Sequence, residues 1–142
     1  MNCSEVMTEN PVCCLPTDAV SQAAREMRRE DVGAVPVIND EQTRKLIGIV
    51  TDRDLAIKVV AESRDPNNTK VQDVMTTVIV ACRATDEVSS AIGAMEEHQL
   101  RRIPVLDADG RIMGIISQAD VATRLHQPST TAEVVQEISQ AA

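Results

Sequence analysis

The chain has 142 residues, a formal net charge of −8 and no phenylalanine, tryptophan or tyrosine. This length suits one compact domain, or two half-domains that share a core, and the apolar fraction of 43% is typical of a globular protein. The acidic charge argues against a broad electrostatic surface for nucleic acid, and the missing aromatic rings exclude the stacking platforms of RNA-binding modules.

The sequence carries no clear signal for a membrane or a metal. No apolar run approaches the roughly 20 residues of a membrane-spanning helix, and the first residues lack the layout of a signal peptide, so we expect a cytoplasmic protein. Four cysteines, Cys3, Cys13, Cys14 and Cys82, form no C-x-x-C pair and match no zinc-site spacing. We expect buried thiols that pack as small apolar side chains.

The first half of the chain predicts an extended piece, a helix, a hairpin and a second helix. Residues 12–14 form the extended piece, and apolar residues then recur at helical spacing from Asp18. Two strands are expected at residues 35–38 and 46–50, and a helix from Asp52 to about residue 62.

The second half repeats this order after a polar linker, SRDPNNTK at residues 63–70. We expect an extended piece at 80–82, a helix from Asp86, strands at 103–106 and 112–116, and a helix from 118 to about 126. The tail from Thr130 predicts one further helix. The predicted organisation is therefore a first motif at residues 4–62, a linker at 63–70, a second motif at 71–126 and a helical tail at 127–142.

An internal repeat is the strongest signal in the sequence. The triplet Val6-Met7-Thr8 recurs 68 positions later as VMT at 74–76, and VPV at 35–37 recurs at the same offset as IPV at 103–105. Gly48 and Asp54 recur 66 positions later as Gly114 and Asp120, so two residues are lost in the hairpin turn. The repeat predicts an α/β fold of two pseudo-twofold-related β-α-β-β-α motifs, with three-stranded sheets packed on helices.

One phrase occurs in each half, GIVTDRD at residues 48–54 and GIISQAD at residues 114–120. In one interpretation, Thr51 with Asp54 and Ser117 with Asp120 are capping boxes that begin a helix. In the other, the helix start attracts a phosphate while the carboxylate accepts hydrogen bonds from ribose hydroxyls. The two interpretations are compatible, because one carboxylate can do both.

The doubled pattern, VMT with VPV and GIVTDRDL and then VMT with RRIPV and GIISQADV, resembles the cystathionine β-synthase (CBS) domain. Two such motifs in tandem resemble a Bateman module, and the resemblance extends from about Ser4 to Leu125. The stretches TDRDLAIK and EEHQLRRIPV are similar to stand-alone bacterial CBS-pair proteins of the hypoxic-response type. Each piece alone would be a weak signal, but the doubled pattern is strong.

The resemblance implies that adenosine compounds bind in two clefts between the motifs. The residues it assigns to the first cleft are Thr51 and Asp54 with Val80, Ala81 and Cys82. The residues it assigns to the second cleft are Ser117 and Asp120 with Val12, Cys13 and Cys14, beneath Gly33 and Ala34.

Arg101 and Arg102 stand directly before the second h-P-V strand, where the family often places a phosphate-binding side chain. A guanidinium suits phosphate oxygens because it can donate two parallel hydrogen bonds. The alternative is a solvated basic pair at the start of a strand. The equivalent residues of the first motif are the small Gly33 and Ala34, so the two clefts need not bind equally well.

These observations favour a regulatory sensor that binds AMP, ADP, ATP or a related adenosyl ligand, requires no cofactor and is not an enzyme. No P-loop, nucleophile elbow or H-E-x-x-H motif is present. The expected partners are an adenine nucleotide, a second copy of the chain in a homodimer and an effector protein that the sequence does not identify. The alternative is a ligand-free stress or interaction module. Redox sensing through Cys14 and Cys82 is a third hypothesis, and it would require exposed thiols of low pKa.

Overall fold

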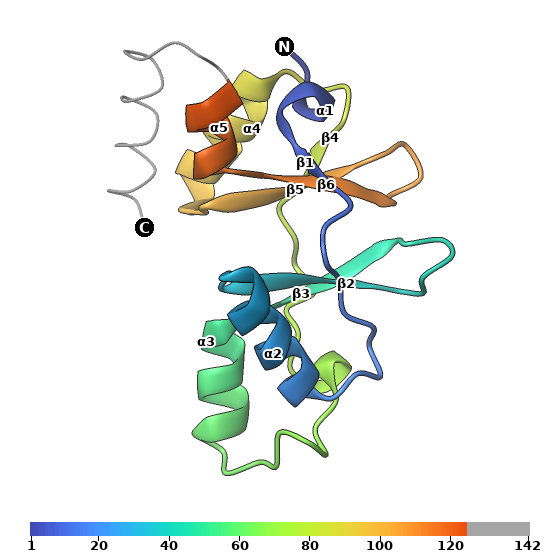
Figure 1. The fold of residues 1–142 in the computed structure, drawn as a ribbon, viewed down its shortest axis with the longest axis vertical. Helices are drawn as coiled ribbons and strands as arrows, with labels where there is room; N and C mark the ends of the chain where they lie inside the picture. The colour runs from blue at the N-terminus through green and yellow to red at the C-terminus, as the bar shows by residue number, and fades with distance from the viewer. Residues whose placement is uncertain (125–142) are drawn as a thin grey trace. The chain divides into compact units, whose positions relative to one another are not determined.

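The computed structural model describes residues 1–124, and the chain divides into two compact units (Figure 1). Unit 1 comprises Met1–Pro11 together with the described residues from Val80 onward, and unit 2 comprises Val12–Ile79. The first eleven residues, called the N-terminal segment below, therefore pack with the second repeat instead of the first. The two units are described separately.

Unit 2 is built on an antiparallel hairpin of β2 (Ala34–Ile38) and β3 (Leu46–Thr51). The helices α2 (Val20–Glu30) and α3 (Asp52–Leu55) contact these strands and each other, on one face of the hairpin in Figure 1. Helix α3 continues as a π-helix, η1 (Ala56–Val60), and a 3₁₀ turn, η2 (Val71–Asp73), follows the linker. Two isolated bridges extend the hairpin: Cys14 pairs in parallel with Val37, and Thr76 pairs in antiparallel with Ile49.

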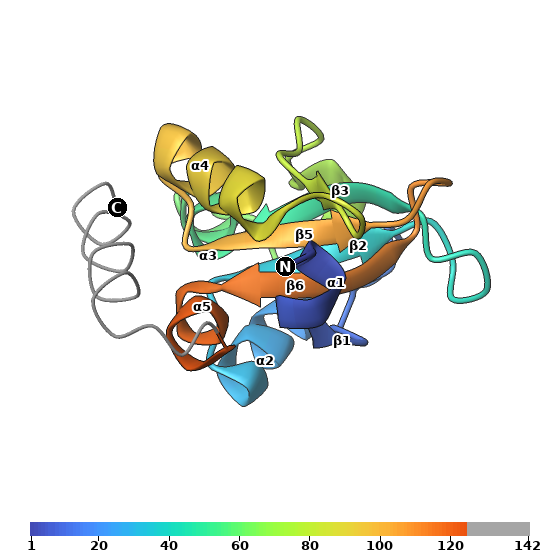
Figure 2. The same ribbon diagram turned by 90° about the horizontal axis from the view of Figure 1, so that it is seen from above.

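Unit 1 contains a four-stranded sheet in the order β1-β6-β5-β4. Its elements in chain order are α1 (Cys3–Val6), β1 (Thr8–Glu9), β4 (Cys82–Arg83), α4 (Val88–His98), β5 (Arg102–Leu106), β6 (Ile112–Ser117) and α5 (Gln118–Arg124). Strands β5 and β6 form the antiparallel hairpin, β4 runs parallel to β5, and β1 pairs with β6. Helix α1 contacts β6, α4 and α5, and Figure 2 shows it beside β6.

Both amphipathic helices begin two residues later than the sequence pattern predicts. Asp18 and Asp86 were expected to open them, but each carboxylate instead accepts a hydrogen bond from the backbone of the preceding turn, from Leu15 N at 2.9 Å and from Arg83 N at 2.8 Å. The helices α2 and α4 start at Val20 and Val88. Short polar side chains favour such turns as strongly as helix caps.

Each unit has its own apolar core. In unit 2 the core lies between the hairpin and α2, with Val20, Ala23, Val35, Val37 and Val50 almost fully buried. In unit 1 the buried residues are Cys3, Met7, Cys82, Ala91, Met95, Ile103, Val105, Ile116 and Val121. The expectation that the cysteines pack as buried thiols is confirmed for three of them, while Cys13 is half-buried, and all four are free.

The predicted fold class is confirmed: both units are mixed α/β, with helices packed on sheets. Among the described residues, however, the sheets have four strands in unit 1 and two in unit 2, instead of the three expected in each. The pairing of the VMT segments with the hairpins was not expected. In unit 1 this segment forms the strand β1, and in unit 2 it forms an isolated bridge at Thr76. The extended pieces are shorter than predicted, since they are confined to Cys14 and to β4. The predicted tail helix lies outside the described residues. Within residues 1–124, no helix is long and apolar enough to cross a membrane.

Candidate functional site

In unit 2, the repeated phrase forms the predicted capping box at the start of α3. Thr51 N donates to Asp54 Oδ2 at 3.0 Å, and Asp54 N donates back to Thr51 Oγ1 at 3.0 Å. The two residues therefore satisfy each other's backbone N–H groups, which is the purpose of a capping box. Asp54 is only 8% exposed, so its carboxylate needs further partners.

Those further partners are Thr76 and Lys58, which sequence reasoning did not assign to the site. Thr76 Oγ1 lies 3.3 Å from both carboxylate oxygens of Asp54 and donates to them. Lys58 Nζ forms an ion pair with Asp54 Oδ1 at 3.0 Å and donates to Val74 O at 2.9 Å. Lys58 therefore links the start of α3 to the VMT segment.

Unit 1 repeats this arrangement at the start of α5. Ser117 N and Ser117 Oγ donate to Asp120 Oδ2 at 3.0 and 3.1 Å, and Asp120 N lies 3.2 Å from Ser117 Oγ. Thr8 Oγ1 donates to Asp120 Oδ1 at 2.9 Å. The threonine of a VMT triplet thus contacts the aspartate of the repeated phrase in both units.

The glycine of each repeated phrase provides room for the methionine of the VMT triplet that packs on it. A Cβ atom at Gly48 would lie 2.6 Å from Met75 Sδ, and a Cβ atom at Gly114 would lie 2.6 Å from Met7 Sδ and 2.7 Å from Thr8 O. Real Cβ atoms do not approach other atoms so closely. The space beside each glycine is therefore occupied by protein atoms of the VMT segments.

In unit 1, the predicted arginines flank the phrase. Arg102, the first residue of β5, is the register partner of Ser117, and Gln118 N donates to Arg101 O at 3.2 Å. Both arginine side chains are exposed. The structure thus brings Arg101 and Arg102 beside Ser117 in one unit.

In unit 2, the equivalent positions are Gly33 and Ala34, and they flank Thr51 in the same way. Ala34 is the register partner of Thr51, and Asp52 N donates to Gly33 O at 2.9 Å. A Cβ atom at Gly33 would lie 2.9 Å from Asp52 Oδ2, so the Asp52 carboxylate occupies the space beside this glycine.

The remaining predicted residues lie in the extended pieces. Val80 and Ala81 are half-buried and lead into Cys82 at the start of β4, while Val12 is 39% exposed and leads to Cys13 and Cys14 in unit 2. Each predicted cleft draws residues from both units, and both clefts stay predictions.

While the chain is folded, burial disfavours a reactive thiolate at Cys14 and at Cys82. Burial raises the pKa of Cys14 to about 12, and the nearby carboxylates of Asp18 and Glu26 add to the shift. Burial also raises the pKa of Cys82. A reactive thiolate needs the opposite, an exposed sulfur of low pKa.

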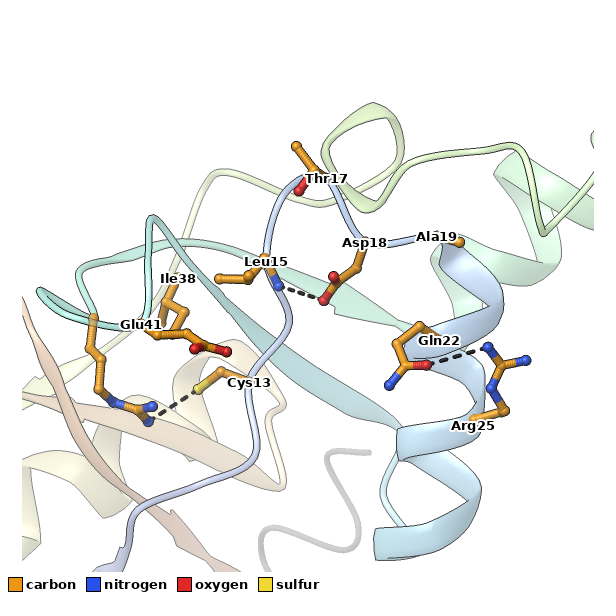
Figure 3. A pocket seen from close by; sticks show the side chains of 10 residues that line it. Cys13, Leu15, Thr17, Asp18, Ala19, Gln22, Arg25, Ile38 and Glu41 are labelled. Carbon is orange, nitrogen blue, oxygen red and sulfur yellow. Dashed lines mark hydrogen bonds between the residues drawn. The ribbon is translucent and has the colours of Figure 1, made fainter.

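Cys13 lines an open hollow of about 750 Å³ that lies entirely within unit 2 (Figure 3). Arg44 donates to Cys13 Sγ at 3.6 Å, and Gln22 and Arg25 of α2 form another part of the lining. The hollow borders Ile38, where β2 ends, whereas Thr51 pairs with the first residue of β2. It is therefore at the far end of the hairpin from the capping box.

The sequence contained a signal for the residues that were missed. Thr8 and Thr76 stand at the same place in the repeated VMT triplet, and Lys58 follows Asp54 at the four-residue spacing of an ion pair on a helix. The triplets showed that the segments matter, but not that each packs on a glycine and an aspartate. Among residues 1–124, no group of three or more His, Cys, Asp and Glu side chains could hold a metal ion.

Comparison with known proteins agrees with this geometry. The CBS domain family model matches residues 3–61 and again residues 71–127. Hypoxic response protein 1 of Mycobacterium tuberculosis is 34% identical over 121 residues, which is 85% of this chain and 82% of that protein. These matches indicate no catalytic family.

Two solved structures share the fold. The crystal structure of Hypoxic Response Protein I with two coordinated zinc ions matches with a TM-score of 0.78 and 32% identity, covering 90% of this chain and all of that one. The structure of CBSX2 in complex with AMP matches with a TM-score of 0.72 and 25% identity, covering 97% of this chain and 98% of that one. The chain therefore belongs to the CBS domain family, and its two domains in tandem form a CBS-pair regulatory module.

Proposed function

We propose that this CBS pair is a sensor of adenine nucleotides, with AMP, ADP, ATP or a related adenosyl ligand held at the helix starts that follow β3 and β6. The observation that carries the proposal is the pairing of Arg102 with Ser117, which brings exposed arginine residues beside a hydroxyl and a carboxylate in one unit. Such a set matches the phosphate and the ribose of a nucleotide. A structural relative that is 25% identical was solved with AMP bound, which supports this ligand class.

The carboxylate of Asp120 is the better candidate for ribose. Asp120 is half-buried, whereas Asp54 is 8% exposed and is paired with Lys58. A ribose hydroxyl can reach a half-buried carboxylate at a lower desolvation cost. The arginines beside Ser117 favour the same side, because the equivalent Gly33 and Ala34 carry no charge.

Calorimetric titration of AMP into Asp54→Asn and Asp120→Asn tests this assignment. If a carboxylate holds ribose hydroxyls, its replacement should weaken one binding event by about 1.5–3 kcal/mol, the usual range for hydrogen bonds to a charged group. This is roughly a tenfold to hundredfold loss of affinity. We expect the larger loss for Asp120→Asn. A larger loss for Asp54→Asn would reverse the ranking, and no loss in either variant would leave both residues as helix caps.

Replacing Arg101 and Arg102 together by Ala tests the phosphate contact. Because both side chains are exposed, the melting temperature of the free protein should change by no more than about 3 °C. Affinity should fall progressively from adenosine to AMP to ATP. An equal loss for adenosine and ATP would contradict a phosphate contact.

The second candidate function is a ligand-free interaction module. The observation that favours it is that Thr8 and Thr76 already donate to the two carboxylates. A thermal-shift series with adenosine, AMP, ADP and ATP separates the candidates. A ligand at about 100 times its dissociation constant adds roughly 2.7 kcal/mol, which corresponds to about 5–10 °C for a chain of this size. No shift with any nucleotide would favour the interaction module.

We further propose a homodimer that buries the outer face of α3 and η1. Ile57 and Val60 on this face are 45% and 75% exposed, and a twofold pairing would cover both copies of the patch at once. Light scattering should report twice the monomer mass of 15.4 kDa. Val60→Glu should shift the particle toward the monomer, and a monomer in the unmodified protein would contradict the proposal.

A further inference from the structure

Two thiols from distant parts of the sequence meet in the core of unit 1. Cys3 in α1 and Cys82 in β4 belong to the same buried cluster, with exposures of 0% and 7%. Burial is the main cause that raises the pKa of each thiol, and each thiol also shifts the pKa of the other. Cys3 Sγ also contacts Glu87 O at 3.8 Å, and Cys82 Sγ contacts Pro104 O at 3.6 Å.

Backbone hydrogen bonds hold Cys3 beside the turn that follows β4. Cys3 N donates to Asp86 O at 2.8 Å, and Ser4 N donates to Ala84 O at 3.1 Å. Asn2 forms a bridge with Glu87. The start of the N-terminal segment is therefore hydrogen-bonded along the turn that follows β4, and the position of Cys3 does not depend on the thiols themselves.

We propose that Cys3 and Cys82 form a redox-active dithiol, which a small disulfide such as oxidised glutathione converts into a disulfide that fastens the N-terminal segment to β4. The thiolate of one cysteine attacks oxidised glutathione, forms a mixed disulfide and releases one glutathione thiolate. The thiolate of the other cysteine then attacks the protein sulfur and releases the second. Two protein S–H groups are oxidised, one glutathione disulfide is reduced to two thiols, and the protons pass through water to the glutathione.

The reaction requires local opening of the N-terminal segment. Burial raises the pKa of both thiols, so little thiolate is present while the segment is docked. The segment is held by the four residues of α1 and the two residues of β1, and such short elements open at a lower free-energy cost than a whole unit. Oxidation should therefore be slow in buffer and faster in urea concentrations below the unfolding transition.

Unit 2 supplies the matched control. By the 68-residue offset, Cys82 corresponds to Cys14 and Cys3 corresponds to Val71. Cys14 and Val71 are also buried together in one core cluster. The same position in unit 2 therefore holds only one sulfur, and valine is an accepted replacement for the other.

The test incubates the full chain with oxidised and reduced glutathione at increasing ratios, followed by acid quenching, alkylation and peptide mapping. We expect the loss of two hydrogen atoms, a peptide pair joined through Cys3 and Cys82, and full reversal by dithiothreitol. The closed loop would enclose all of unit 2, so the melting temperature should rise by about 5 °C or more. Cys14→Val should oxidise in the same way, whereas Cys3→Val should not.

Two results would overturn the inference. One is a map of the unmodified protein, oxidised in mild urea, that shows glutathione adducts or other cysteine pairs but no link between Cys3 and Cys82. The other is an unchanged melting temperature after the link has formed, because the N-terminal segment would then contribute nothing to the stability of unit 1. Both readouts use the natural sequence, so they hold even if a cysteine variant folds poorly.

Discussion

The two units build the same contact from segments at very different distances along the chain. In unit 2, Asp54 accepts a hydrogen bond from the hydroxyl of Thr76, which lies 22 residues further along the chain. In unit 1, Asp120 accepts a hydrogen bond from the hydroxyl of Thr8, which lies 112 residues earlier in the chain. In each unit, a VMT segment packs on one hairpin and on the helix start that follows it. In both units the VMT segment comes from the other sequence repeat, so a structural unit does not coincide with a sequence repeat.

The surroundings of the two carboxylates differ as well. Asp54 is buried and paired with Lys58, while Asp120 is half-buried and lies beside Ser117, the register partner of Arg102. The residue that corresponds to Lys58 is Arg124, whose side chain lies outside the described part of the structure. One copy of the phrase is thus embedded in its unit more deeply than the other.

The largest expected effect comes from filling the space beside the methionines. Gly114→Ala places Cβ 2.7 Å from the backbone oxygen of Thr8, whereas in Gly48→Ala the corresponding contact with Thr76 O is 3.2 Å. We expect the free energy of unfolding to fall by about 2–3 kcal/mol in Gly114→Ala and by about 1–2 kcal/mol in Gly48→Ala, the usual cost of overpacking. Urea denaturation measures both.

Gly93→Ala is the control for these variants. Gly93 lies within α4, and a Cβ atom there would meet nothing within 4 Å. Alanine in a helix interior should add about 0.5–1 kcal/mol of stability relative to glycine. If all three variants lose the same stability, the packing of Met7 and Met75 on the glycines is not the cause. In Gly114→Ala we also expect faster proteolysis within residues 1–11, since detaching this segment relieves the clash.

Local patterns predicted the elements of each unit well. The h-P-V triplets predicted the strands β2 and β5, and the hydroxyl-x-x-Asp spacing of Thr51 and Ser117 predicted the capping boxes. Both signals depend on neighbours within a few residues. The late starts of α2 and α4 were missed because Asp18 and Asp86 satisfy the preceding turn, a choice that helical periodicity does not reveal.

Long-range packing was harder to predict. The repeat identified the VMT segments as important, but a repeated triplet does not specify which hairpin it joins, so the pairing of Thr8 with β6 was not foreseen. The π-helix after Leu55 was also missed, because its five residues are too few to reveal a change in the apolar period. For the candidate site, the capping residues could be predicted, while Lys58 required the four-residue spacing to be considered together with burial.

A second prediction measures the hydroxyl of each VMT segment. Thr8→Val and Thr76→Val keep the shape of the side chain and remove the donor to the carboxylate. Thr8 donates at 2.9 Å, while Thr76 lies 3.3 Å from both oxygens of a carboxylate that keeps Lys58. In urea denaturation, we expect the free energy of unfolding to fall by about 1 kcal/mol in Thr8→Val and by about 0.5 kcal/mol in Thr76→Val.

A double-mutant cycle separates this hydrogen bond from other effects of the substitution. When Asp120 is already Ala, Thr8→Val should cost almost nothing, because the acceptor is gone. Thr8→Ser should retain most of the stability. Equal costs of Thr8→Val in both backgrounds would show that the hydroxyl does not act through Asp120.

A third prediction concerns the ion pair found in unit 2. The Lys58 side chain is 43% exposed and that of Asp54 is 10% exposed, so solvent weakens the attraction. Lys58→Met should cost about 0.5–1 kcal/mol at low salt, and the difference should shrink at high salt. Lys45→Met, at an exposed position in the hairpin turn, is the control and should change stability less. A salt-independent loss would indicate that the side chain contributes by packing instead of by charge.

The smallest effect is expected in the two hairpin turns, where the units differ by two residues. Hydrogen bonds from the backbone of Thr43 and, to a lesser extent, Gln42 lower the pKa of Asp40, and a hydrogen bond from the backbone of Arg111 lowers that of Asp107. Because both pKa values are depressed in the folded chain, the stabilisation is complete above the unfolded pKa of about 3.9 and is lost as the pH falls through the folded value.

Carboxyl NMR titration checks this directly. The midpoints of Asp40 and Asp107 should both lie below those of the same residues in short peptides of each turn, and the amide signals of Thr43 and Arg111 should shift with the same midpoints as their acceptors. Asn at either position should remove that transition from its own turn and leave the other unchanged, because each turn belongs to a different unit. A midpoint at or above the peptide value would mean that the turn is formed without its aspartate. The two turns would then differ in length alone, and the contrast between the units would rest on the carboxylates of Asp54 and Asp120.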